Sequence, residues 1–187
     1  MPNDSNLHQP DPNDGSGSAL RPTKPTKIRP TVPADVPALK TMIDALGLFP
    51  GEMLDDMMAD YFMAADSNHC WLTDHDDNGP LGVAYYAPER LTEGTWNLYL
   101  IAIQSDRQGQ GRGKAMMRHI EQTLRARGER LLLVETSGLP SYEYQRTFYQ
   151  RCGYTEEARI RDFYQAGEDK VVFWKTLTAT PVADHQP

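Results

Sequence analysis

The sequence has few of the features that mark membrane, secreted or metal-binding proteins. No apolar run comes near the roughly 18 residues of a membrane span. Its two cysteines, Cys70 and Cys152, are far apart and do not indicate a disulfide framework. The N-terminus lacks the basic flank and apolar stretch of a secretory signal, and the His, Cys and carboxylate residues show no metal-ligand spacing. We therefore expect a soluble cytoplasmic protein that binds neither membrane nor metal.

Basic residues are also scarce. The net charge is -7 at pH 7, which argues against nucleic-acid binding because phosphate neutralisation needs clustered Lys and Arg. Between Gly47 and Pro88 there is no Lys or Arg. The eight acidic residues of that stretch are Glu52, Asp55, Asp56, Asp60, Asp66, Asp74, Asp76 and Asp77. They favour a cationic partner such as an amine, with a merely solvated acidic surface as the alternative.

The chain of 187 residues has the length of one domain. Residues 1–27 are rich in Pro, Asn, Asp, Gly and Ser and have almost no large apolar side chains, so we expect a disordered tail there. The domain should span residues 28–178, followed by a frayed tail at 179–187.

Hydrophobic periodicity and turn residues predict seven strands and four helices. The strands are expected at about 28–32, 69–73, 81–87, 95–103, 131–134, 157–164 and 170–177, and the helices at about 33–46, 53–62, 113–127 and 142–151. The strands up to residue 103 should run antiparallel. The segment 131–134 is continuously apolar, which is typical of a strand covered on both faces. The strand, helix and strand from 95 to 134 should therefore form a parallel crossover.

A glycine-rich loop opens the helix of this crossover. The small residues of Gln108–Lys114 leave backbone N–H groups able to face an anion, and phosphate oxygens fit such a position. Four basic residues lie in or beside the loop: Arg107, Arg112, Lys114 and Arg118. In an acidic chain they favour a polyanionic ligand, with a solvated helix face as the plainer alternative.

Two common phosphate-binding motifs fit this loop poorly. A P-loop needs Ser or Thr after Gly-Lys, whereas Ala115 follows Lys114 here, and the opening glycine is missing. A dinucleotide fold needs GxGxxG, and the spacing here is GxGxG, although Glu135 does imitate the ribose-binding acid. Too few residues remain for a second nucleotide-binding half, so dinucleotide binding is the second choice.

A third kind of phosphate binder accounts for more residues. The segment LYLIAIQSDRQGQGRGKAMM resembles the acetyl-CoA signature of the GNAT superfamily of N-acetyltransferases, with Gln108, Gly111 and Gly113 at the matching positions. The segment RTFYQRCGY resembles the second hallmark of that family, which includes Phe148 and Tyr149. The likeness extends over about residues 28–178. Around both segments the sequence is similar to bacterial ribosomal-protein-alanine acetyltransferases.

The resemblance implies a fold and a cofactor. The fold is α/β (α+β), the GNAT fold, with a mixed, mostly antiparallel sheet of about seven strands, a central parallel crossover and helices on both faces. Acetyl-CoA is the only cofactor implied. Backbone groups of a splayed strand, the glycine loop and a residue in place of a cofactor-contacting Asn should bind it. These residues are Ile101, Ala102, Ile103, Gln108, Gly109, Gln110, Gly111, Arg112, Gly113, Lys114 and Tyr142.

The resemblance also implies the chemistry, which is transfer of the acetyl group to a primary amine by direct attack in a ternary complex. Tyr149 matches the tyrosine that protonates the departing sulfur, with a core aromatic residue as the alternative. Glu135 resembles the base of the ribosomal-protein enzymes, with a structural ion pair as the alternative. Another branch takes its base from the position of Asn97, which cannot accept a proton but could order a water.

The sequence says less about the acceptor than about the cofactor. By resemblance, Glu52, Glu89, Asn97 and Tyr164 should border an acceptor that is a small-molecule, peptide or protein amine and is cationic. Homodimer formation stays open. Two other classes also fit the glycine loop: an acyl-CoA-binding regulatory module without catalysis, and a dinucleotide-binding protein. Acetyl-CoA binding would exclude the second of these, and turnover would exclude the first.

Overall fold

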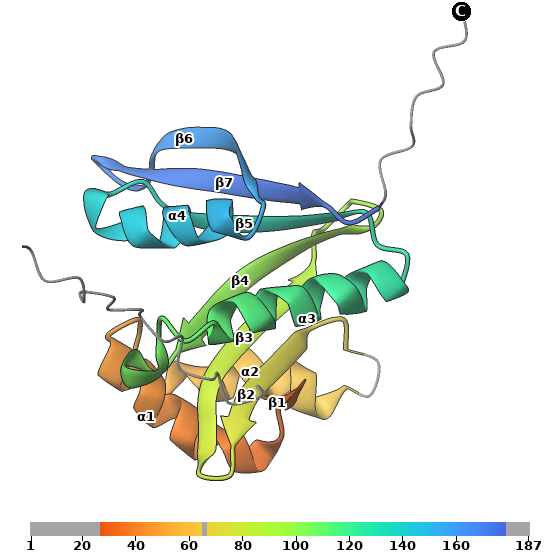
Figure 1. Cartoon of the computed structure of the whole chain (residues 1–187), viewed down its shortest axis with the longest axis vertical. Coiled ribbons are helices and arrows are strands. Elements are labelled where there is room, and N and C mark those ends of the chain that lie inside the picture. Colours follow the sequence, from red (N-terminus) through yellow and green to blue (C-terminus); the bar gives the residue numbers. More distant parts are fainter. Residues whose placement is uncertain (1–26, 65–66, 179–187) are drawn as a thin grey trace, which may run out of the picture.

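The computed structural model describes residues 27–64 and 67–178. The tails predicted at 1–27 and 179–187 lie outside these residues, apart from Lys27. The described strands are β1 (Lys27–Pro30), β2 (Cys70–Asp76), β3 (Gly79–Pro88), β4 (Thr95–Ile103), β5 (Leu131–Ser137), β6 (Thr155–Gln165) and β7 (Glu168–Thr176). The described helices are α1 (Val36–Leu46), α2 (Met53–Met63), α3 (Arg112–Ala126) and α4 (Glu143–Arg151), as Figure 1 shows.

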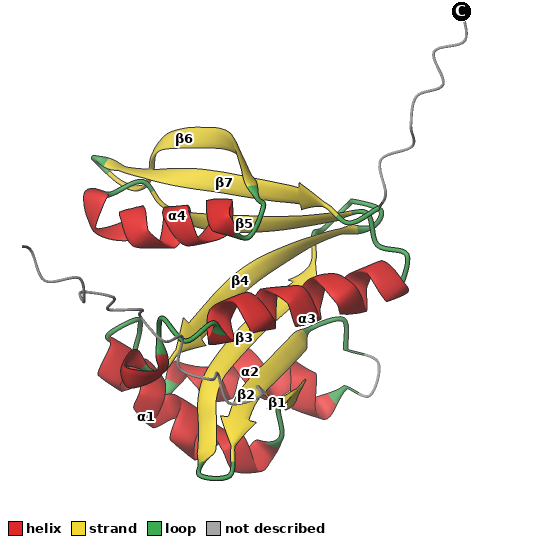
Figure 2. Ribbon diagram, in the orientation of Figure 1, coloured by secondary structure: helices red, strands yellow, loops and turns green. Residues whose placement is uncertain are grey.

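All of these strands form one sheet in the order β1-β2-β3-β4-β5-β7-β6 (Figure 2). β4 and β5 are parallel, and the other neighbouring pairs are antiparallel. α3 connects β4 to β5 and so forms the crossover. The predicted α/β class, the seven-stranded mixed sheet and the parallel crossover are therefore confirmed.

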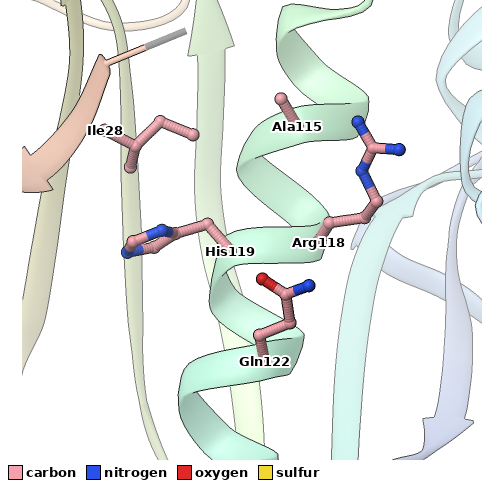
Figure 3. Close-up of a pocket in the computed structure, with 5 residues that line it drawn as sticks. All are labelled: Ile28, Ala115, Arg118, His119 and Gln122. Atoms are coloured by element: carbon pink, nitrogen blue, oxygen red, sulfur yellow. The ribbon is translucent and has the colours of Figure 1, made fainter.

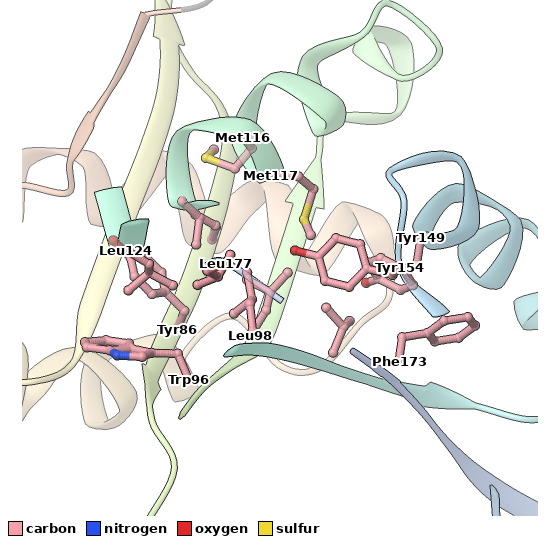
Figure 4. Close-up of a cluster of buried hydrophobic side chains, with 14 of the residues drawn as sticks. Tyr86, Trp96, Leu98, Met116, Met117, Leu124, Tyr149, Tyr154, Phe173 and Leu177 are labelled. Atoms are coloured by element: carbon pink, nitrogen blue, oxygen red, sulfur yellow. The ribbon is translucent and has the colours of Figure 1, made fainter. Parts of the chain in front are cut away.

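Helices cover the two faces of the sheet in pairs. α3 and α4 lie on one face, here called the α3/α4 face, and α1 and α2 lie on the other, the α1/α2 face. The core of the α3/α4 face includes Leu98, Met116, Met117, Ile120, Leu124, Val134, Tyr149, Tyr154 and Phe173, several of which Figure 4 shows side by side. The core of the α1/α2 face includes Leu39, Ile43, Leu54, Met58, Trp71, Val83 and Ala102.

Local sequence explains where α1 ends. Its predicted apolar stripe is buried at Leu39, Met42 and Ile43. Gly47 follows with φ of 64°, and its N–H bonds to the carbonyl of Asp44. This left-handed conformation is easy for glycine and strained for other residues, so the chain leaves the helix at the predicted position.

Glu121 joins α3 to β7 and to the segment that follows α4. Its buried carboxylate accepts hydrogen bonds from Nζ of Lys175 at 2.9 and 3.0 Å and from the hydroxyl of Tyr154 at 3.2 Å. Lys175 also donates to the carbonyl of Cys152 at 2.7 Å. A buried carboxylate needs such partners, because an unpaired charge is costly away from water. The position of α3 is thus fixed against β7 and the end of α4.

One prediction about β5 is wrong. The run Leu131–Val134 was expected to be covered on both faces, but Leu132 and Val134 are buried whereas Leu131 and Leu133 are only half-buried. The α3/α4 face of β5 is closed by helices, while its α1/α2 face is only partly covered. This open side matters below, because Glu135 also lies on it.

Within the described residues, no helix is both long and apolar enough to cross a membrane. The same residues do not bring together three or more His, Cys, Asp or Glu side chains in the way a metal site requires.

Candidate active site

The central feature is a fork between the two parallel strands. β4 and β5 pair only from Thr95 with Leu131 to Leu98 with Val134. Beyond that point β4 continues along β3 as far as Ile103, and β5 continues along β7 as far as Ser137. The two strands therefore diverge, as Figure 1 shows. We call the place just after Leu98 and Val134 the fork.

Backbone groups of β4 face the fork. The N–H of Gln104 donates to the carbonyl of Leu81, and an antiparallel ladder alternates between bonded and outward-facing residues. From the register of β4 with β3, the backbone of Ala102 therefore faces β3, and that of Ile101 and Ile103 faces the fork. Ala102 cannot take the predicted cofactor role through its backbone, because β3 already uses those groups.

The glycine loop lies at the far end of β4. Gly109 and Gly111 have φ of 70° and 79°, and a Cβ atom at either position would meet nothing within 4 Å. Gln108 closes the loop by donating from Nε2 to the carbonyl of Ile103 at 2.9 Å. α3 begins at Arg112, so the N–H groups of its first turn have no carbonyl partner within the helix. These groups form the type of surface that binds phosphate.

Close packing explains the glycine at the second helical position. A Cβ atom at Gly113 would lie 3.2 Å from Cζ of Phe148 on α4. That distance is shorter than an ordinary van der Waals contact, so the aromatic ring approaches the start of α3 more closely than a larger residue would allow. Gly113 therefore lets the two halves of the family signature pack together.

The side chain of Arg112 has a different task from the one predicted. Its Nη1 lies 2.8 Å from Oδ2 of Asp74 on β2, with side chains 5% and 0% exposed. A guanidinium buried in an ion pair cannot also bind phosphate at the surface. Arg112 thus attaches the start of α3 to the sheet, and only its backbone N–H remains for a ligand.

Two pockets flank α3. One of about 460 Å³ lies between α3 and the end of α4 and is lined by Lys114, Arg118, Glu121, Gln122, Arg125, Arg151, Cys152, Gly153 and Lys175. Its excess of cations suits an anionic ligand. The other, of about 280 Å³, lies on the opposite flank, where Figure 3 shows Ile28 of β1 across from Ala115, His119 and Gln122. Arg118 borders both.

Tyr149 lies in the apolar core beside the fork. Its ring packs at 5.8 Å from Phe173 and at 6.3 Å from Tyr154, and it shares the core of the α3/α4 face with Leu98 and Val134. Burial, with a smaller contribution from Cys152, raises the pKa of Tyr149 above its ordinary value. The phenol is therefore neutral over a wider range of pH than a free tyrosine.

Glu135 is the first β5 residue beyond the fork. Its Oε2 lies 2.7 Å from Nζ of Lys170. Burial and then the charge of Glu135 raise the pKa of Tyr164, with smaller contributions from Glu168 and Tyr142. The structure thus brings Glu135, Tyr142 and Tyr164 into one neighbourhood. The predicted alternative for Glu135, an ion pair, is present, and its partner is Lys170.

The other predicted acceptor residues lie in three different surroundings. Asn97 is 1% exposed, and its Oδ1 has no hydrogen-bond partner among the described residues. Glu89 accepts a hydrogen bond from Tyr99 at 3.0 Å. Glu52 is exposed at the start of α2, and no described contact joins it to the others. Sequence reasoning missed Tyr99, because its contact with Glu89 and its place at a strand irregularity depend on the register of β3 and β4 and not on a local pattern.

Comparisons with known proteins agree with this arrangement. A family model described as an acetyltransferase (GNAT) domain matches residues 66–156. A protein of Desulfovibrio desulfuricans assigned to the GNAT family of acetyltransferases is 30% identical, with a TM-score of 0.77, over 82% of this chain and 100% of that chain. Among curated proteins, none matches the chain in sequence.

Two further solved structures share the fold at lower identity. The ribosomal-protein-S18-alanine N-acetyltransferase of Escherichia coli is 18% identical, with a TM-score of 0.68, over 84% of this chain and 97% of that chain. An aminoglycoside 6'-N-acetyltransferase in complex with coenzyme A is 14% identical, with a TM-score of 0.68, over 83% of this chain and 99% of that chain. Likeness at this level shows the architecture alone.

Proposed function

The chain belongs to the GNAT family of acetyltransferases, and from that premise we propose that it transfers the acetyl group of acetyl-CoA to a primary amine by direct attack in a ternary complex. The observation that supports this most is the fork, which lies between a phosphate-type loop at one end and a buried tyrosine and a carboxylate at its base. The dinucleotide alternative loses its support, because the matched family binds its ligand through another fold.

The residues of the loop fit the phosphate portion of acetyl-CoA. Gly109 and Gly111 bring the backbone close to a bound oxyanion without a side chain in the way, and the first N–H groups of α3 point to the same place. The cationic pocket beside Lys114, Arg118 and Arg151 suits the remaining phosphate of the nucleotide. When bound, acetyl-CoA supplies the activated acetyl group as a thioester.

The fork fits the amide-containing arm of the same molecule. Ile101 and Ile103 direct backbone groups toward it, as derived above, although the carbonyl of Ile103 already accepts from Gln108. Ile101 and the N–H of Ile103 can therefore add a short ladder of hydrogen bonds to an extended ligand. This recognition uses the same physics as the addition of a strand to a sheet edge.

Tyr149 is the proposed acid. During transfer the amine nitrogen bonds to the acetyl carbon, the carbon–sulfur bond breaks, and the sulfur needs a proton. Burial keeps the phenol of Tyr149 protonated at neutral pH. The raised pKa also makes it a weak acid relative to a thiol of ordinary pKa about 8.5, so Tyr149 first donates a hydrogen bond to the departing sulfur, and the proton follows as the carbon–sulfur bond breaks. Solvent then returns the proton to Tyr149.

Glu135 is the proposed base, acting directly or through one water. Lys170 occupies Oε2, so the proton of the attacking amine is accepted at Oε1 and later released to solvent. The ammonium group also fixes the direction of the carboxylate, which makes Lys170 a positioning residue. Tyr164, whose pKa is raised by burial and then by the charge of Glu135, is its proposed acceptor-side neighbour, and Tyr142 keeps its expected role on the cofactor side.

The test is an assay of purified protein with acetyl-CoA and a panel of primary amines and short peptides. Coenzyme A release and the mass of the product are followed together, and a reaction without amine gives the rate of simple thioester hydrolysis. We expect release that depends on the amine and a product heavier by one acetyl group. Acetyl-CoA binding, measured separately by calorimetry, shows whether the first substrate is recognised.

The outcomes separate the remaining function classes. Tight acetyl-CoA binding without turnover on any amine would point to a regulatory module that has lost catalysis. Failure to bind acetyl-CoA would reject the proposal at its first step. Turnover that proceeds without an N-acetylated product would reject the amine as acceptor while leaving the cofactor assignment intact.

A further inference from the structure

A line of aromatic rings crosses the α1/α2 face and ends at the fork. Tyr85 of β3 stacks on Trp71 of β2 at 4.5 Å, with planes 13° apart, and on Tyr99 of β4 at 5.4 Å, with planes 28° apart. The ring of His69 is nearly parallel to that of Tyr85, and Nδ1 lies 2.6 Å from the tyrosine hydroxyl. The rings thus run from the beginning of β2 across β3 to β4.

Tyr99 occupies a special position in β4. Tyr85 pairs with Leu100 and Tyr86 pairs with Leu98, so Tyr99 is the extra residue of a β-bulge. It directly follows Leu98, which forms the last pair with β5. Its side chain is 51% exposed. The bulge therefore presents one face of an anchored aromatic ring to solvent at the point where the strands separate.

Tyr99 and Glu135 face each other across the fork. Leu98 and Val134 are partners in the last parallel pair, and both side chains point into the core of the α3/α4 face. Glu135 is the next residue on β5 and points to the opposite face, because side chains alternate along a strand. Tyr99 lies on that same face, since it stacks on Tyr85. The proposed base and the exposed ring are thus the first residues beyond the fork on their two strands.

Negative charge surrounds the ring. The hydroxyl of Tyr99 donates to Oε2 of Glu89 at 3.0 Å, and partial burial together with Glu89 raises the pKa of Tyr99 to about 12. Burial raises the pKa of the neighbouring Tyr85, and the negative charge of Asp60 on α2 raises it further. A ring whose hydroxyl donates to a carboxylate is electron-rich, and such a ring attracts cations over its face.

An unmet hydrogen-bond acceptor lies at the same place. Oδ1 of Asn97 is buried without a partner among the described residues, two positions before Tyr99 on β4. Buried polar atoms are nearly always hydrogen-bonded in folded proteins. Because the Asn97 side chain is only 1% exposed, an ordered water suits this acceptor, and the atom marks a polar position in the sheet next to Tyr99.

We propose that Tyr99 and Glu89 bind a second positively charged nitrogen of the acceptor, so that the substrate is an aliphatic diamine rather than a monoamine. The nitrogen that attacks has to lose its proton near Glu135, so it cannot be the charge that an electron-rich ring and a carboxylate select. A different nitrogen of the same molecule must occupy the ring. This inference rests on the proposed acetyl transfer and specifies its substrate class.

The experiment compares 1,4-diaminobutane with 1-aminobutane, which have the same carbon chain and differ by one charge. We expect kcat/KM to be roughly 10-fold or more higher for the diamine. Tyr99→Leu and Glu89→Gln should each remove most of this preference, measured as the ratio of kcat/KM for the diamine to kcat/KM for the monoamine. Tyr99→Phe keeps the ring but loses the bond to Glu89, so it should lie in between. Tyr144→Leu, a change at a 64% exposed tyrosine of α4, is the matched control.

Binding is measured as well, by titrating the diamine into the protein in the presence of coenzyme A. Heat of binding that is present in the wild type and absent in Tyr99→Leu supports the inference. Equal rates for the two amines, with variants that do not discriminate, would overturn it while acetyl transfer stands. Absence of diamine binding to the wild type would also overturn it. Failure of every amine in turnover would instead count against the proposed function.

Discussion

The two faces of the sheet differ in how completely helices cover them near the fork. On the α3/α4 face, large apolar side chains such as Met116, Ile120 and Phe173 are fully buried in one core. On the α1/α2 face near the fork, the nitrogens of Trp71 and Trp174 and the amide oxygen of Asn97 are buried without partners among the described residues. The α3/α4 face also has such an atom, Oδ1 of Asp74, so the faces differ in helix cover: the α3/α4 face is closed, and the α1/α2 face is partly open near the fork.

We infer that the closed face binds acetyl-CoA, the substrate that the whole family would share, and that the other face selects the amine acceptor, which can vary. The closed face holds α3, its loop and Tyr149, which together form the proposed cofactor side. The partly open face holds Glu135 and the half-exposed ring of Tyr99, which a ligand can reach. A fold can keep one chemistry and change its acceptor by altering only the second face.

The largest effect is expected from breaking the buried ion pair of the closed face. Asp74→Leu leaves the guanidinium of Arg112 buried without a partner and should lower the free energy of unfolding by about 3–5 kcal/mol. The double variant Asp74→Leu/Arg112→Leu should recover most of that loss, because two apolar side chains can fill the space. Urea unfolding of the three proteins measures both effects. A double variant as unstable as the single one would contradict the argument.

Removal of the Tyr149 hydroxyl, the proposed acid, should lower the rate of transfer without changing the affinity for acetyl-CoA. Tyr149→Phe keeps the ring packing and loses the hydroxyl, so we expect kcat to fall about 100-fold with acetyl-CoA affinity unchanged. Because burial raises the pKa of Tyr149, the wild-type phenol keeps its proton up to and beyond about pH 10. Its titration should therefore cause no loss of rate between about pH 8 and pH 10. A normal rate for the variant would make Tyr149 a core residue only.

Two variants distinguish a base from a structural ion pair at the fork. As a base, Glu135→Gln should lower kcat/KM about 10-fold at neutral pH, with recovery at high pH, where the amine loses its proton unaided. Lys170→Met removes the other partner and should slow the reaction less, since it only disturbs the direction of the carboxylate. Rate profiles against pH give the answer. Equal, pH-independent losses in both variants would indicate that the pair is structural.

The smallest effect is expected from the loop backbone. Gly111 has φ of 79° with open space around it, so Gly111→Ala adds strain of about 1–2 kcal/mol without a clash. We expect it to weaken acetyl-CoA binding several-fold, measured by calorimetry. Gly47→Ala is the control, since its φ of 64° gives similar strain at the end of α1. It should lose stability but keep its affinity, and equal losses of affinity would contradict a local role for the loop.

Most of the fold and part of the site could be predicted, because the signals are local. The apolar periodicity of α3, the glycine at its start and the apolar run of β5 all lie within short segments. The strand expected at 95–103 has those bounds in the structure. The second hallmark was placed on a helix, where Phe148 meets Gly113.

The rest depends on partners that are distant in the chain. Arg112 pairs with Asp74 on a strand 38 residues earlier, and no local pattern distinguishes it from a phosphate-binding arginine. Tyr99 owes its exposure to a bulge that exists only through the register of β3 and β4. Likewise, Leu133 was expected to be covered, because an apolar run does not reveal where helices stop short of a sheet.

The place of β7 has a consequence for how the protein is made. Among the described strands, β7 is the last to leave the ribosome, yet it pairs with β5 along the whole stretch from Leu131 to Ser137. The nascent chain can therefore form the glycine loop and its anchor to β2 while the strand of Glu135 still lacks its main neighbour. Until Lys170 and the residues after it have been synthesised, one wall of the fork is missing, so a chain cut before β7 would carry the glycine loop without the complete proposed site.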